Sequence, residues 1–180
     1  MEKYPVYLIC CQRNERLIAR NLNALWFFQR QSAVEVQDEL VDIILTRSAP
    51  GFSQVIEEGT NYTVYVWCTT KVSSIVVAHP NYPERAARQI FRRLEHGECQ
   101  DQSSLDQLLA EATTPAKLDK LGQIEAELNE TRLILLDNID KVLARGEKLD
   151  ELLAKSEHLS DSSKTFLSRS RKLNRCCVLS

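Results

Sequence analysis

The first hundred residues alternate between the apolar patterns of strands and of helices. Residues 4–12 are rich in Val, Tyr, Ile and Leu and predict a strand, and residues 16–28 predict a second, less regular one. Three further strand candidates follow at residues 54–57, 62–69 and 73–78. Helical patterns begin near Ser32 and near Pro83. The order strand-strand-helix-strand-strand-strand-helix predicts an α+β domain, in which helices cover the faces of a five-stranded antiparallel sheet.

The first predicted helix is apolar on more than one side. Ser32-x-x-Glu35 fits a capping box, so we expect the helix to begin at Ser32. A helix with two apolar stripes is either buried deeply or covered by something on its outer flank. Val36, Leu40 and Ile43 are the candidate residues for a groove on that flank. The alternative is that they face the sheet as ordinary core residues.

The pattern changes at Thr114-Pro115, which is a helix-start signal. Counting alternately three and four residues from Leu121 gives a seam of sixteen positions, of which ten are apolar and none is acidic. Such a seam is typical of a coiled coil. The seam comprises Leu121, Ile124, Leu128, Thr131, Leu135, Asn138, Val142, Arg145, Leu149, Leu152, Ser156, Leu159, Ser163, Phe166, Ser170 and Leu173.

These patterns divide the chain into four parts. Ser103-x-x-Asp106 predicts a short helix between the mixed region and the coiled coil. The parts are a domain over residues 1–100, a linker with a short helix over 101–114, a coiled-coil segment over 115–174 and a C-terminal motif over 175–180.

Arg145 is the one charged residue in the seam. An unpaired buried guanidinium costs several kcal/mol, and Arg does not lose its charge to escape that cost. The residue therefore either meets acceptors from partner helices and fixes their register, or extends to solvent at the edge of a loose coil. Periodicity alone leaves both alternatives open.

Composition and motifs argue against an enzyme. The chain has 180 residues, 43% of them hydrophobic and 27% charged, with a net charge of -2, so no nucleic-acid partner is expected. Cys10 and Arg16 match the C-x5-R spacing of cysteine phosphatases, but no Gly between them permits a phosphate-binding loop. No G-x-x-x-x-G-K-[ST] or C-x-x-C string occurs, and no His has ligand partners at metal-binding spacing. We therefore expect no catalytic residue, no cofactor and no metal.

The C-terminal residues suggest a lipid anchor. Cys177-Val178-Leu179-Ser180 fits the C-a-a-X pattern for farnesylation of Cys177. Cys176 offers a second site, for a palmitoyl or a second prenyl group, and two lipid chains make an anchor stable. Basic residues without acidic neighbours precede the motif and favour an anionic membrane surface. No apolar run reaches the roughly 18 residues of a membrane span, and no signal peptide is evident.

Two stretches of the chain resemble a known family. Residues 138–152, NIDKVLARGEKLDEL, closely resemble the centre of the R-SNARE motif of synaptobrevin-type proteins. The segments FFQRQSAVEVQDEL, VIEEGTNYTVYVWC and PNYPERAAR resemble a longin domain, the profilin-like module of long R-SNAREs. Together with the terminal Cys-Cys-a-a-X, these features make the chain similar to lipid-anchored longin-domain R-SNAREs. The longin helix departs from the family in carrying the charged Asp38 and Glu39.

The resemblance implies a function. Arg145 would form the central ionic layer of a four-helix bundle with three Q-SNARE helices (Qa, Qb and Qc), which drives membrane fusion in vesicle trafficking. The coiled-coil segment would be poorly ordered until it joins them. The longin domain could fold back over the SNARE helix, the prenyl group, or both. The expected location is the cytoplasm, with cycling between the cytosol and the cytoplasmic face of Golgi, endosomal or vesicle membranes.

One alternative from another class remains. A non-fusogenic adaptor or tether would join a longin-like domain to a generic coiled coil. It predicts two-stranded self-association, whereas the SNARE interpretation predicts one copy of this chain in a heteromeric complex.

Overall fold

A computed structural model describes residues 4–23, 25–58, 62–115, 118, 143–144 and 146–176. Its centre is a five-stranded sheet with strand order β2-β1-β5-β4-β3, in which every neighbouring pair is antiparallel. The α+β prediction with a five-stranded antiparallel sheet is confirmed. The strands are β1 (Val6–Gln12), β2 (Arg16–Arg20), β3 (Phe52–Glu58), β4 (Tyr62–Cys68) and β5 (Ser73–Ala78).

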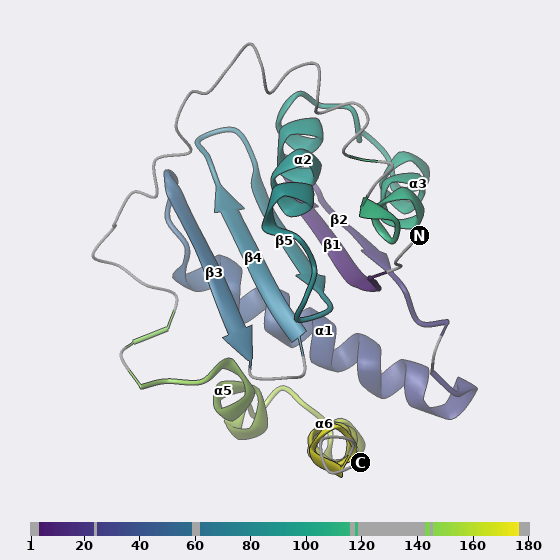
Figure 1. Cartoon of the computed structure of the whole chain (residues 1–180). Helices are drawn as coiled ribbons and strands as arrows, with labels where there is room; N and C mark the ends of the chain where they lie inside the picture. Colours follow the sequence, from purple (N-terminus) through teal and green to yellow (C-terminus); the bar gives the residue numbers. More distant parts are fainter. Residues whose placement is uncertain are drawn as a thin grey trace.

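Helices cover both faces of this sheet (Figure 1). On one face lie α2 (Glu84–Glu95) and α3 (Gln102–Ala112). The other face is covered by α1 (Phe27–Arg47). Two further helices contact α1 at the bottom of the view, α5 (Leu149–Lys155) and α6 (Asp161–Cys176). The coiled-coil residues between 118 and 143 lie outside the described part of the chain.

The alternation of side chains along the central strands explains why both faces are covered. In β1, Ile9 and Cys11 belong to the apolar cluster under α2 and α3, whereas Leu8 and Cys10 belong to the cluster under α1. All four are at most 3% exposed. A strand that is apolar on both faces needs a layer on each side, so this sheet requires two helical layers.

Three predicted boundaries were wrong. The first helix begins at Phe27, with Trp26 as N-cap, because the Gln29 side chain accepts a hydrogen bond from the Trp26 amide at 3.2 Å. Ser32 therefore lies inside the helix, where it is buried. The second strand ends at Arg20 rather than at residue 28, because the chain leaves the sheet to enter this longer helix.

The short helix after the sheet also begins earlier than expected. Asp101, rather than Ser103, caps α3, and its carboxylate accepts from the Ser104 amide at 2.8 Å. Leu105 and Leu108 of α3 are almost fully buried in the core under β1 and β2. The helix is thus packed against the sheet as closely as α2 is.

The described part of the coiled-coil segment differs from a single long helix. It forms α5 and α6, and Ser156 ends α5 in an extended conformation. The leucines of these residues pack against the domain instead of forming part of a free helix.

Candidate functional site

The C-terminal helices pack on the domain at the face covered by α1. Five leucines of the segment belong to the same buried cluster as residues of α1 and the sheet. Each is at most 9% exposed. They are Leu143, Leu149, Leu153, Leu159 and Leu167. We call this contact, between residues 143–170 and the α1 face, the docking interface.

The predicted groove residues lie at this interface. Leu40 is 4% exposed and sits inside the shared cluster. Val36 and Ile43 are half-buried and pack against it. The same cluster also contains sheet residues such as Val66. The groove interpretation and the core alternative therefore both apply to these residues.

Polar contacts reinforce the interface at the start of α6. The Glu35 Oε2 atom accepts hydrogen bonds from the Ser160 and Ser163 hydroxyls, both at 2.6 Å, and from the Ser160 amide at 3.3 Å. These bonds, with the Ser160 hydroxyl first, lower the pKa of the Glu35 carboxyl. One turn further along α1, the Glu39 Oε1 atom accepts from the Ser156 hydroxyl at 2.6 Å. The acidic face of α1 is therefore used to hold the C-terminal segment.

A second polar group holds the segment before α5. Arg47 Nη1 lies 2.9 Å from Glu147 Oε2, which also accepts from the Ala144 amide at 2.9 Å. The Ala144 amide and then Arg47 lower the pKa of the Glu147 carboxyl. The hydroxyl of Tyr62, in β4, donates to Asp150 Oδ1 at 2.6 Å. These contacts hold the chain on both sides of Leu149, the first residue of α5.

Only part of the predicted seam is described. Leu149, Leu159 and Ser163 are buried at the docking interface, and Leu152, Ser156, Phe166 and Ser170 are half-buried. Leu173 and Cys176 belong to α6, of whose last turns only the backbone is described. The central Arg145 and the lipidation residue Cys177 lie outside the described residues. So do the remaining seam positions, which are Leu121, Ile124, Leu128, Thr131, Leu135, Asn138 and Val142.

Sequence reasoning missed three of the five docked leucines: Leu143, Leu153 and Leu167. Leu153 is fully buried and Leu167 is 7% exposed, yet each follows a seam position by one residue. The docked face therefore combines seam positions with positions one residue further on, about 100° around the helix. The signal that could have identified Leu153 is its distance of four residues from Leu149, which places two apolar side chains on one face of a helix.

The residues of the phosphatase-like match lack the required chemistry. Cys10 is fully buried in β1, and this burial raises the pKa of its thiol to about 12, although Arg16 lowers it. A cysteine nucleophile needs a lowered pKa, so this thiol stays protonated and inert. The Arg16 guanidinium instead pairs with Asp42 of α1 at 2.6 Å.

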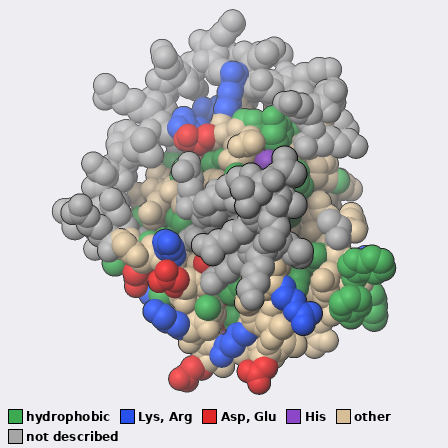
Figure 2. All heavy atoms as spheres, turned by 60° about the horizontal axis from the view of Figure 1, so that its bottom comes forward, with side chains coloured by type: hydrophobic (Ala, Val, Ile, Leu, Met, Phe, Trp, Pro, Cys, Tyr) green, Lys and Arg blue, Asp and Glu red, His purple; other side chains and the backbone are tan. Residues whose placement is uncertain are grey.

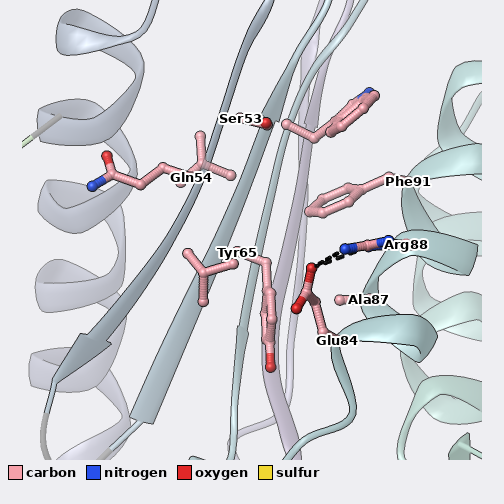
Figure 3. Close-up of a pocket in the computed structure, with 10 residues that line it drawn as sticks. Ser53, Gln54, Tyr65, Glu84, Ala87, Arg88 and Phe91 are labelled. Atoms are coloured by element: carbon pink, nitrogen blue, oxygen red, sulfur yellow. Dashed lines mark hydrogen bonds and ion pairs between the residues drawn. The ribbon is translucent and has the colours of Figure 1, made fainter. Parts of the chain in front are cut away.

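The hollow between β3, β4 and α2 is too small for a substrate (Figure 3). Its volume is about 40 Å³, far below the several hundred that ligand pockets offer. Arg88 and Glu84, one turn apart on α2, pair with each other at the rim of this hollow, as the dashed lines show. Among the described residues, no group of three or more His, Cys, Asp or Glu side chains is placed to hold a metal ion. Within the same part of the chain, no helix is long and apolar enough to cross a membrane.

Comparison with known proteins identifies the family. The Synaptobrevin family model matches residues 120–179, which contain all of α5 and α6. The chain is 29% identical over 178 residues to the synaptobrevin homolog YKT6 of Saccharomyces cerevisiae, covering 89% of this chain and 88% of that protein. It is 30% identical to the YKT6 homolog of Eremothecium gossypii, with 97% and 98% covered, and 32% identical to that of Candida glabrata, with 89% and 86% covered. Because the likeness spans both the sheet domain and the C-terminal helices, the chain belongs to the synaptobrevin family and is a longin-domain R-SNARE of vesicle trafficking.

Proposed function

We propose that the R-SNARE segment of this chain joins three Q-SNARE helices, one each of the Qa, Qb and Qc kinds, in a four-helix bundle that drives membrane fusion. Its heptad seam and its membership of the synaptobrevin family support this assembly. Arg145 supplies the central ionic layer, opposite three Gln side chains. SNARE proteins are not enzymes, which agrees with the inert Cys10.

The proposal includes a membrane anchor. A farnesyl group on Cys177 and a palmitoyl or second prenyl group on Cys176 hold the bundle's C-terminal end at the bilayer. The chain then cycles between the cytosol and the cytoplasmic face of Golgi, endosomal or vesicle membranes.

The docking interface makes this R-SNARE autoinhibited. The observation that carries this part is that Leu149, Leu159 and Ser163 belong to the predicted seam and are also buried against the domain. A side chain that packs against the α1 face is not available to partner helices. The docked state and the bundle therefore exclude each other, and the seam is free for Q-SNAREs only after undocking.

Docking and the bundle compete for apolar side chains of the same segment. Burial of five leucines contributes about 1.5–3 kcal/mol each in gross terms. A complete four-helix bundle buries the whole seam, so binding of Q-SNAREs outcompetes docking.

Leu153 and Leu167 allow docking to be tested without changing the seam. The double variant Leu153→Ala, Leu167→Ala removes two buried side chains of the docked state, at a cost of about 2–5 kcal/mol each. We expect residues 143–176 to become sensitive to protease, while the yield of bundle with Q-SNAREs is unchanged or higher. Leu149→Ala is the matched control, because Leu149 is buried in the docked state and is also a seam position, so its loss weakens both docking and the bundle. An unchanged proteolysis rate in the double variant contradicts autoinhibition.

Stoichiometry tests the bundle itself. Purified chain mixed with Qa, Qb and Qc helices should give complexes with one copy of each, measured by light scattering after size exclusion. Arg145→Glu should reduce the yield of aligned complex, because a carboxylate repels the Gln carbonyls that accept from the guanidinium. Two-stranded self-association without Q-SNAREs would instead favour the adaptor or tether.

A further inference from the structure

Three consecutive aromatic residues project from the molecule where α1 begins. Trp26, Phe27 and Phe28 are 73%, 88% and 76% exposed. In Figure 2 hydrophobic side chains form a group that stands out at the right edge, on the side where α1 starts in Figure 1. We call these three residues the aromatic cap. Large apolar side chains at such exposure favour contact with another apolar phase.

The directions of the three side chains favour a bilayer over a protein groove. Phe27 and Phe28 are successive helical positions about 100° apart, and Trp26 precedes them in an extended conformation, so the cap forms no single helical stripe. A groove on a protein partner covers one side of such an end. The interfacial region of a bilayer surrounds a protruding tip on all sides, and Trp is enriched at that depth.

The charges around the aromatic cap favour an anionic surface. Between Arg20 and Glu35 the sequence contains no acidic residue, and the first turn of α1 has none. Arg30 is exposed, and its Nε atom donates to the Leu25 carbonyl at 3.3 Å, which holds the guanidinium beside the cap. The positive end of the helix dipole points the same way. Anionic lipid headgroups complement this arrangement.

The acidic residues further along α1 do not oppose such a surface. Asp38 and Asp42 pair with Arg20 and Arg16 of β2. Glu35 accepts the hydroxyls of α6. These three carboxylates of α1 are thus engaged within the molecule.

We propose that the aromatic cap inserts into the headgroup region of anionic bilayers and gives the longin domain a membrane contact of its own, separate from any lipid on Cys176 or Cys177. The contact rests on the exposure of the cap and does not depend on the proposed bundle. It lies beyond the docking interface, so the chain keeps it in the docked state.

Fluorescence of Trp26 tests insertion directly. The chain contains two Trp residues, and Trp67→Phe leaves Trp26 as the single reporter. The full chain also carries Cys176→Ser and Cys177→Ser, so that no lipid is attached. With vesicles of phosphatidylcholine and phosphatidylserine, we expect Trp26 emission to shift to the blue and brominated acyl chains to quench it. Unchanged emission at saturating vesicle concentration overturns the proposal.

Vesicle flotation measures how much the aromatic cap contributes. We expect Phe27→Ser with Phe28→Ser to weaken partitioning by roughly tenfold or more, since two exposed Phe side chains no longer leave water. Val55→Ser is the control, because it removes an exposed apolar side chain from β3. Equal partitioning of the cap variant and the control overturns the proposal. So does a wild-type dimer that the cap variant loses without any change in partitioning, since a second copy then covers the cap.

Discussion

At the scale of single residues, Glu35 holds the C-terminal segment through several hydrogen bonds. One of its oxygens accepts from two hydroxyls and one amide at the start of α6. A carboxylate accepts such bonds better than an amide does, because the bonds are charge-assisted. Glu35→Gln should therefore weaken docking, which is measured as faster hydrogen exchange of the α6 amides. Glu15→Gln, on the exposed turn between β1 and β2, is the matched control.

The pH dependence of docking follows from the same residue. Hydrogen bonds lower the pKa of Glu35 in the docked state from its ordinary value of 4.5. Its contribution is therefore fully present above pH 4.5 and is lost as the pH falls through the lowered value. Glu147 acts with the same sign. If Glu35→Gln leaves exchange as slow as the Glu15→Gln control at neutral pH, the carboxylate has no role in docking.

Some residue roles were out of reach of the sequence. Glu35 fitted a capping box with Ser32, but the helix extends back to Trp26 and Glu35 bonds to serines more than a hundred positions away. Local spacing reports local bonds, so it does not reveal an acceptor for a distant segment. The buried strands and the apolar face of α2, by contrast, follow directly from the period of their apolar residues.

At the level of elements, the docked conformation of the C-terminal segment differs from the one that its heptad seam predicts. The heptad seam predicts one continuous helix, whereas the docked segment breaks after α5 at Ser156. Periodicity identified the apolar side chains correctly but not their partner, because Leu149 and Leu159 suit both a bundle and the α1 face. This is why the burial of Leu153 and Leu167 beside these seam positions appeared only in the structure.

Gly146 separates these two conformations. It has φ +88 in the docked chain and no atom within 4 Å of where a Cβ would stand. A continuous helix needs a negative φ at this position. Ala costs about 1–2 kcal/mol in the left-handed conformation and stabilises a helix by about 1 kcal/mol relative to Gly.

Gly146→Ala should therefore shift the segment from the docked state toward the bundle. The expected change of about 2–3 kcal/mol corresponds to roughly a hundredfold shift in the equilibrium. It is measured by protease sensitivity of α5 and by the fraction of chain in bundle at limiting Q-SNARE concentration. Gly97→Ala is the control, since Gly97 also has a positive φ but follows α2. Equal effects on α5 from the two substitutions would rule out this role for Gly146.

At the scale of the whole molecule, the longin domain and the SNARE segment share one hydrophobic cluster. Leu40, Val41 and Ile44 of α1 contact the same core as the leucines of residues 143–167. Under the proposed autoinhibition, the domain competes with Q-SNAREs at an effective concentration that covalent linkage fixes. Dilution of the protein weakens Q-SNARE binding but leaves docking unchanged.

This linkage predicts the kinetics of assembly. If Q-SNAREs bind only the undocked segment, the observed assembly rate of the full chain should level off at the rate of undocking as their concentration rises. A chain beginning at Pro115 has no domain to dock on, so its rate should increase linearly over the same range. Stopped-flow mixing with fluorescently labelled Q-SNAREs measures both. A linear dependence for the full chain, with the same slope as the shorter chain, would show that docking does not control access to the seam.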